Sequence, residues 1–242
     1  MPEGNELDRL RVVLVGARNP LNLGAAARAM SNFGVLHLRV VNPYEPSLLE
    51  ARSAVGPAAE LLARAEQFSS LADAVSDCVL VVGTTAIQHR ELQHAKDRLD
   101  AGALLIRQKL TAGNVAVVFG SEKTGLSNDD LSHCHWLLHI PTRDEHLSMN
   151  LGQAVAVTLY ELVRENKALP AAQDAVVTTA AELERITATL LEALELSGYT
   201  SPETMAATEE KARRMIRRMA LNSRDAEVLL GMLRQIVWKL QH

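Results

Sequence analysis

Hydrophobic and polar positions along the chain fall into two patterns, short apolar runs and longer segments with helical spacing. The runs are rich in Val, Leu and Ile and end at glycine, proline or polar residues, as expected of buried strands. They predict five strands: 10–17, 36–43, 78–86, one from 115 that continues into a loop ending at 125, and 136–142. The intervening segments predict helices at 24–33, 57–77, 100–110, 128–134 and 149–166, the first of them ended by Gly34.

Strands that alternate with helices indicate an α/β fold with a mainly parallel sheet and helices on both faces. The strands are apolar almost throughout rather than at every second position. That is typical of parallel strands that are covered on both sides.

The pattern changes near residue 167 and predicts a second region. We expect a domain over 1–167, a connector over 168–180 and a helical extension over 181–242. Helical spacing runs through 180–198, a Ser-Pro pair at 201–202 predicts another helix start, and a third helix is expected over 223–240. Because three helices form only a small core, we expect them to pack on the main domain or on a partner subunit.

Composition is that of an ordinary globular protein, with 242 residues of which 48% are hydrophobic. No apolar run reaches the ~18 residues that span a bilayer, and the first residues lack the pattern of a signal peptide. We therefore expect a cytoplasmic protein. Cys78 and Cys134 are the only cysteines, which excludes a disulfide framework and a cysteine-rich zinc site.

The net charge of −4 argues against a nucleic-acid partner, because phosphate-binding proteins usually carry a basic balance. One basic cluster, KARRMIRR at 211–218, is the exception. It predicts either a solvated helix face or a contact with a nucleic acid through Arg213, Arg214 and Arg217.

Familiar phosphate and metal motifs are missing. Lys123 and Thr124 precede Gly125, the reverse of the order in a P-loop, and no GxGxxG follows the first strand. His133, His135 and His139 lie on or beside a strand, and no carboxylate or cysteine completes a ligand set there. We therefore expect no metal site.

Three segments remain, each leaving the carboxyl end of a predicted strand, where ligands bind in open α/β sheets. They are NPLNLGAAARAM (19–30), VVFGSEKTGLS (117–127) and IPTRDEHLSMNLGQAVAV (140–157). Asn22 and Gly24 precede the first predicted helix, and Arg28 follows one turn later. Taken singly, each segment has an ordinary structural explanation, such as a turn, a glycine loop or a helix cap at Ser148.

In this order and spacing, the three segments resemble the motifs of the SPOUT superfamily of RNA 2′-O-methyltransferases. The closest resemblance is to the TrmJ group, which methylates the ribose of cytidine or uridine at tRNA position 32. It covers about residues 10–165, and the helical tail also fits. The resemblance implies a carboxyl-terminal trefoil knot, which pattern analysis would not predict because knots are very rare. It also implies S-adenosylmethionine as the cofactor and a homodimer with its active site at the subunit interface, acting on tRNA without a metal or a membrane.

The resemblance further implies roles for individual residues. The cofactor pocket is expected to be lined by Thr84, Thr85, Ala86, Gly120, Ile140, Leu147, Ser148 and Met149. Arg28 is the expected catalytic arginine. Its pKa makes it a poor base, so we also consider that it grips a phosphate and stabilises the developing alkoxide.

Four further residues belong to the expected catalytic set. Asn22 would orient Arg28 or a phosphate, and Glu122 would hold a loop or an arginine. Ser148 and Asn150 would position the ribose or organise the knot.

Alternative functions remain open from the sequence. The same fold could methylate ribosomal RNA, or the chain could be a knotted RNA-binding protein without transfer activity. A generic nucleotide-binding α/β protein is a further alternative. The sequence does not determine the target base or the tRNAs chosen.

Overall fold

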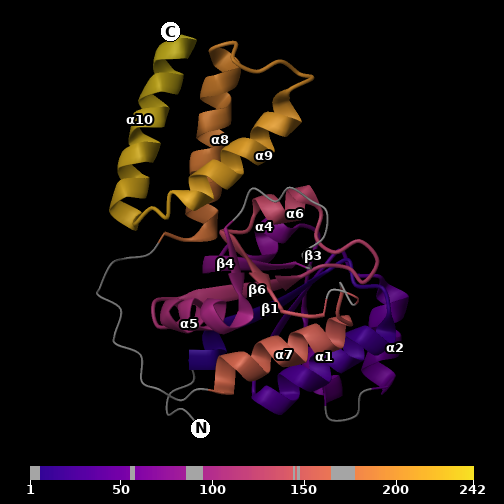
Figure 1. Cartoon of the computed structure of the whole chain (residues 1–242). Helices are drawn as coiled ribbons and strands as arrows, with labels where there is room; N and C mark the ends of the chain where they lie inside the picture. The colour runs from indigo at the N-terminus through magenta and orange to yellow at the C-terminus, as the bar shows by residue number, and fades with distance from the viewer. Residues whose placement is uncertain (1–5, 55–57, 86–94, 144, 146–147, 165–177) are drawn as a thin grey trace.

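A parallel seven-stranded sheet forms the centre of the larger part of the molecule (Figure 1). The computed structural model describes residues 6–54, 58–85, 95–143, 145, 148–164 and 178–242. In sheet order the strands are β3 (Glu66–Phe68), β2 (His37–Val41), β1 (Leu10–Val15), β6 (Asn114–Phe119), β4 (Cys78–Thr85), β7 (Trp136–His139) and β5 (Lys96–Arg98). All neighbouring pairs are parallel, so the predicted fold class is confirmed, while the knot stays a prediction.

Helices cover both faces of this sheet. One face packs on α1 (Pro20–Phe33), α2 (Glu45–Ala54), α3 (Ala59–Ala63), α5 (Leu99–Leu110) and α7 (Leu151–Arg164). The other packs on α4 (Leu71–Ala74), α6 (Asn128–Ser132) and the first residue of α8 (Ala180–Leu196). A 3-10 turn at Glu6–Arg9 leads into β1. Alternate residues of β1 serve the two layers, with Val12 and Leu14 on one side and Val13 on the other.

The five predicted strands are confirmed, but two edge strands and one helix were not predicted. The segment 57–77, expected to be helical, contains α3, then β3, then α4. Both β3 and β5 are three-residue edge strands with the polar sequences EQF and KDR. Edge strands are often short and charged, because these features discourage pairing with another chain, and such strands show no apolar run in the sequence. The helix α2 was also missed.

The first helix begins earlier than expected. Asn19 is its N-cap, and the side-chain oxygen of Asn19 accepts a hydrogen bond from the N–H of Leu21 at 2.9 Å. Pro20 occupies the first turn, where its missing N–H costs nothing, and Gly34 ends the helix with a φ of 72°. The prediction that Asn22 and Gly24 precede this helix is therefore wrong, since both lie inside it.

The carboxyl-terminal residues form a three-helix extension that stands on the sheet domain (Figure 1). It consists of α8, α9 (Met205–Arg218) and α10 (Ser223–Gln241), which share a small apolar core. Contacts of α9 with α6 and of α8 with β4 join the two parts. Of the two packing partners we expected, the structure shows the main domain. Most of the predicted connector lies outside the described residues, and α8 begins at Ala180 after its cap, Thr179.

Within the described residues, no helix has both the length and the apolar character needed to cross a bilayer. Cys78 and Cys134 are buried free thiols. The described part of the chain contains no group of three His, Cys, Asp or Glu side chains arranged to hold a metal ion.

Candidate functional site

Three adjacent strands bring four of the predicted cofactor residues, Thr84, Thr85, Gly120 and Ile140, to the carboxyl end of the parallel sheet. β6, β4 and β7 are neighbours, and their register pairs Gly83 with Val118 and Thr85 with His139. Gly120 and Ile140 directly follow the described ends of β6 and β7. These two residues, Thr84 and Thr85 are partly exposed, and the hydroxyl of Thr84 donates a hydrogen bond to the carbonyl of Val118 at 3.0 Å. Ala86 and Leu147 lie outside the described residues.

The loop after β6 folds back sharply on itself. A Cβ atom at Gly120 would lie 2.2 Å from the carbonyl carbon of Gly125, and Ser121 pairs with Gly125 across the turn. Gly125 itself has a φ of 68°, a conformation that favours glycine. Gly120 is therefore required by the loop's own packing, and its expected place in the cofactor pocket stays a prediction.

This loop presents Glu122 to the start of α1. The carboxylate of Glu122 accepts hydrogen bonds from the N–H groups of Arg18 and Asn19, both at 3.3 Å, and from the side-chain amide of Asn22 at 3.0 Å. Partial burial raises the pKa of Glu122, but these hydrogen bonds outweigh it and leave the pKa below its ordinary value. The carboxylate is thus held ionised at neutral pH.

Asn22 extends the network to the third segment. Its side-chain oxygen accepts a hydrogen bond from the side-chain amide of Asn150 at 2.7 Å. The side-chain oxygen of Asn150 in turn accepts from the N–H groups of Gly152 and Gln153, at 2.9 and 3.3 Å. Asn150, rather than Ser148, therefore satisfies the first N–H groups of α7.

The three sequence segments thus meet in one hydrogen-bonded chain of Glu122, Asn22 and Asn150, which we call the loop network. Ser148 and Met149 lie just before Asn150, Ser148 exposed and Met149 half-buried. Asn19 is the residue that our sequence reasoning missed. Its signal was the Asn-Pro pair, a typical helix start.

Arg28 lies on an exposed face of α1. α7 packs closely against α1, because a Cβ atom at Gly152 would come within 2.5 Å of the Ala25 Cβ. Leu21, two turns before Arg28, is 72% exposed, and Tyr160 of α7 is 53% exposed. Arg28 therefore lies on a helix pair that presents large apolar side chains at the surface.

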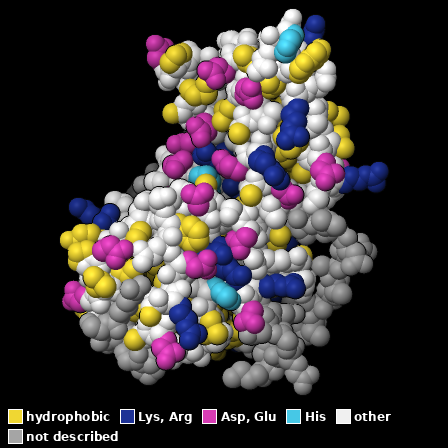
Figure 2. Space-filling view, turned by 180° about the vertical axis from the view of Figure 1, so that it is seen from behind, with side chains coloured by type: hydrophobic (Ala, Val, Ile, Leu, Met, Phe, Trp, Pro, Cys, Tyr) yellow, Lys and Arg dark blue, Asp and Glu magenta, His cyan; other side chains and the backbone are white. Residues whose placement is uncertain are grey.

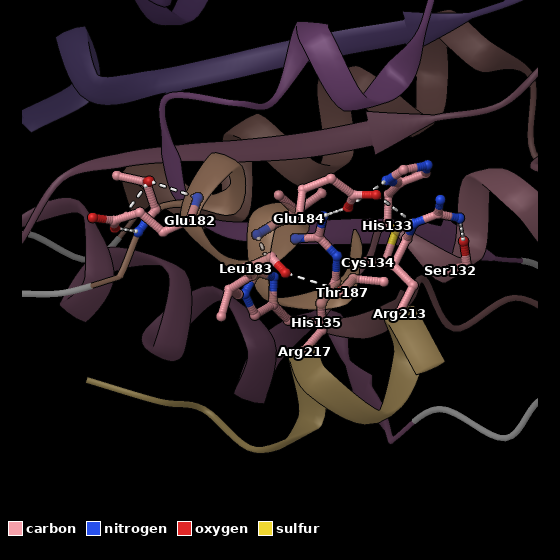
Figure 3. Close-up of polar contacts among 12 residues, drawn as sticks. Ser132, His133, Cys134, His135, Glu182, Leu183, Glu184, Thr187, Arg213 and Arg217 are labelled. Carbon is pink, nitrogen blue, oxygen red and sulfur yellow. Dashed lines mark hydrogen bonds and ion pairs between the residues drawn. The ribbon is translucent and has the colours of Figure 1, made fainter. Parts of the chain in front are cut away.

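Two of the three predicted RNA-contacting arginines are buried instead. Arg213 is 6% exposed and Arg217 is 2% exposed. Figure 3 shows both guanidinium groups directed at Glu184 of α8, with distances of 3.0 Å from Arg213 Nε and 3.3 Å from Arg217 Nη2. Because phosphates cannot reach them in this arrangement, neither a tRNA contact through these two residues nor a fully solvated helix face fits. Arg214 is half-buried.

The same cluster, which we call the junction network, ties the extension to the sheet domain. Arg213 Nη1 donates to the hydroxyl of Ser132 at 3.0 Å and lies 3.3 Å from an Asp129 carboxylate oxygen, both on α6. A further ion pair joins Arg213 to Glu209. Acidic side chains gather at the waist between the two parts in Figure 2. These carboxylates compensate the buried positive charges.

The histidines weighed as metal ligands belong to the surroundings of this junction. Burial, together with the nearby positive charges of Arg213 and Arg217, lowers the pKa of His133 to about 3. Nδ1 of His135 accepts a hydrogen bond from the N–H of Val81 at 3.1 Å. His133 and His135 therefore contact other parts of the fold, which accounts for their positions without a metal ion.

Comparisons with known proteins identify the family of the chain. Residues 9–160 match the model of the SpoU rRNA Methylase family. The tRNA (cytidine/uridine/adenosine-2′-O-)-methyltransferase TrmJ of Pseudomonas aeruginosa (strain UCBPP-PA14) is 33% identical over 239 residues, covering 94% of this chain and 93% of that protein. The tRNA (cytidine/uridine-2′-O-)-methyltransferase TrmJ of Klebsiella pneumoniae is 32% identical, covering 95% and 97%. The crystal structure of TrmJ from Z. mobilis ZM4 superposes with a TM-score of 0.80 at 30% identity, covering 93% of this chain and 98% of that one.

Proposed function

Because the chain belongs to the SpoU rRNA methylase family, we propose that it is a tRNA ribose 2′-O-methyltransferase that uses S-adenosylmethionine. We place its target at nucleotide 32 of the anticodon loop, as cytidine or uridine, and its action in the cytoplasm. The relatives that it matches over more than nine tenths of both chains are named tRNA 2′-O-methyltransferases. The observation that carries the proposal is the loop network, which holds all three family segments at one edge of the sheet.

The residues at that edge fit the expected cofactor. Ile140 and Met149 are partly exposed apolar side chains, and β4 ends in the partly exposed hydroxyl residues Thr84 and Thr85. A mixed apolar and polar lining is typical of cofactor pockets. S-adenosylmethionine would supply a methyl group activated on a sulfonium. Ile140 and Met149 would form the pocket together with Thr84, Thr85, Gly120 and Ser148. Ala86 and Leu147, which lie outside the described residues, would complete it.

In the proposed reaction the ribose 2′-oxygen would accept the methyl group that S-adenosylmethionine supplies, with the cofactor's sulfur as the leaving group. The hydroxyl proton passes to water. Arg28 holds the adjacent phosphate and stabilises the charge that develops on the 2′-oxygen. A guanidinium suits this role because it stays protonated and offers a fixed fork of donors.

The loop network supports Arg28 indirectly. Glu122 fixes the backbone of Arg18 and Asn19 at the start of α1, and Asn22 ties that first turn to Asn150. The direction of the helix, and so the position of Arg28, is therefore set by contacts with both other segments. Precise placement of this kind accounts for a large share of enzymatic acceleration.

We further propose that the active site is completed by a second subunit. The exposed apolar residues Leu21, Val157 and Tyr160 lie on α1 and α7, the same two helices that position Arg28. Large exposed apolar patches typically mark protein interfaces. A dimer through this face would bring Arg28 to the cofactor of the partner.

Shared sites can be tested by complementation. Mixed dimers of Arg28→Ala and Met149→Glu chains contain one site with both residues intact, so activity should return on mixing. Two inactive homodimers that stay inactive after subunit exchange would argue against a shared site.

The experiment that tests the function incubates the purified protein with labelled S-adenosylmethionine and unmodified tRNA, followed by mapping of the labelled nucleotide. A tRNA with a 2′-deoxyribose at position 32 is the control and should accept no label. Ribosomal RNA is included as a second substrate because the matching family is described as an rRNA methylase family. Label in ribosomal RNA alone would favour the alternative enzyme, and RNA binding without transfer would indicate a silent RNA-binding protein.

A further inference from the structure

One face of α10 carries large apolar side chains at the surface. Val228, Met232, Ile236 and Leu240 recur every four residues and are 43–59% exposed. Residues four apart lie on one side of a helix, so these four form a continuous stripe, which we call the α10 stripe. In Figure 1 the helix runs along the outer side of the extension, beside α8.

The stripe is distinct from the face that holds the extension together. Ala226, Leu233 and Val237 are buried, and Ala226 and Leu233 belong to the core shared with α8 and α9. A solvated helix normally has polar residues on the face opposite its core. An apolar stripe outside the core is instead typical of a surface that binds a protein.

Charged residues at the two ends of the stripe show what kind of partner fits. Asp225 lies seven residues before Met232, and Lys239 lies seven residues after it. Val228 and Ile236 lie four residues on either side of the same methionine. Reversed about Met232, Asp225 therefore falls at the position of Lys239 and Val228 at that of Ile236, whereas Leu240, at the margin of the stripe, falls at the position of Arg224.

We propose that α10 pairs in antiparallel orientation with α10 of a second copy of this chain, with Met232 on the two-fold axis. Each Val228 then faces an Ile236, and each Asp225 faces a Lys239, because a two-fold contact uses the same patch on both copies. Antiparallel helices also place the negative end of one helix dipole beside the positive end of the other. This inference does not depend on the activity proposed above, and its contact is separate from the α1–α7 face, because α10 lies at the other end of the molecule in Figure 1.

The surroundings of the stripe disfavour an RNA occupant. RNA binding requires several cations near phosphates, and Lys239 is balanced by Asp225 along this face. Glu227 and Arg234 project from the other exposed side of the helix, as their helical positions require.

Disulfide trapping tests the pairing on the intact protein. Met232→Cys places two symmetry-related thiols next to each other, whereas Cys78 and Cys134 are buried and do not compete. Mild oxidation should therefore give a covalent dimer, since a disulfide forms only between Cα atoms within about 7 Å. Arg234→Cys, equally placed on α10 but on the other exposed side, is the matched control and should give several-fold less.

Charge exchange tests the register. In the Met232→Cys background, Asp225→Lys and Lys239→Asp should each lower the yield of covalent dimer, and the double exchange should restore it. Equal trapping at positions 232 and 234, or no recovery in the double exchange, would overturn the proposal. A third result would also overturn the proposal. In it, tRNA protects the Met232→Cys thiol from a thiol reagent, whereas a higher protein concentration gives no protection.

The tRNA methylation assay, run on the same samples, separates this inference from the proposed function. Methylation without trapping at position 232 would refute the α10 pairing and leave the enzyme intact. Trapping without methylation would support the pairing and refute the activity.

Discussion

The loop network and the junction network both join segments that are far apart in the chain, but they differ in exposure. Glu122 and Asn150 are exposed and Asn22 is half-buried, so the loop network borders solvent where a substrate can approach. Arg213 and Arg217 are almost fully buried and face Glu184. An exposed network can orient a reactive group at small energetic cost, whereas buried charges must be compensated or they destabilise the fold.

The junction network is compensated only in part. In the described structure, Nε and Nη1 of Arg217 have no hydrogen-bond partner. Burial lowers the pKa of Arg217, and the neighbouring carboxylate of Glu184 acts against this shift. The comparison therefore predicts that substitutions in the loop network affect activity, and substitutions in the junction network affect stability.

The largest effect is expected at Arg28, whose side chain projects from the helix that the loop network orients. Arg28→Ala should lower kcat/KM about 100- to 1,000-fold, the range seen when one transition-state donor is removed. Arg28→Lys should lose nearly as much, because an ammonium group lacks the planar fork. Steady-state methylation of tRNA measures both, with the exposed Arg64→Ala as control. Near-normal turnover of Arg28→Lys would contradict the proposed role.

The next largest effect is expected at Glu184. Glu184→Gln leaves two buried guanidinium groups without their shared carboxylate and should lower the free energy of unfolding by about 3 kcal/mol. Denaturant unfolding measures the change, and Glu195→Gln, an exposed position on the same helix, should change little. A stability equal to that of the parent protein would mean that the junction is not held by this carboxylate.

A smaller effect is expected from the pH dependence of the junction. The pKa of His133 is lowered to about 3 by burial and by Arg213 and Arg217, so the folded state excludes a proton that the unfolded state binds below about pH 6.5. Stability contributed by the neutral imidazole is complete above pH 6.5 and falls as the pH drops towards 3. At pH 5 the loss should be about 1–2 kcal/mol.

Thermal unfolding at pH 7 and pH 5 measures this loss. His133→Gln removes the titrating group, so its unfolding temperature should change less between these two pH values. His242→Gln, at an exposed position, should behave like the parent chain. An equally steep pH dependence in His133→Gln would assign the effect to other groups.

The smallest of these effects is expected within the loop network. Glu122→Gln keeps the size of the side chain but removes the charge that accepts three hydrogen bonds. Loss of a charged hydrogen-bond acceptor of this kind costs about 1.5 kcal/mol, which corresponds to about a tenfold lower kcat/KM. The free energy of unfolding should fall by less in Glu122→Gln than in Glu184→Gln. A large loss of stability with unchanged kcat/KM would reverse the contrast between the two networks.

Several features of the fold followed from the sequence because they depend on local pattern. Continuous apolar runs located β1, β2, β4, β6 and β7, and helical spacing located α7 and most of α1. The polar strands β3 and β5 were missed because each is short and has a sheet neighbour on one side only. The three segments of the candidate site were also visible in the sequence, as unusual loops after strands.

The tertiary structure alone decided which side chains meet. The sequence shows Glu122, Asn22 and Asn150 as polar residues in separate segments, and only the parallel sheet order brings them within hydrogen-bond distance. It likewise shows Arg213 and Arg217 as part of a basic helix, and their burial depends on where α8 and α6 lie. Spacing along a chain reports which face of an element a residue occupies. What covers that face is set by long-range packing, which no local pattern encodes.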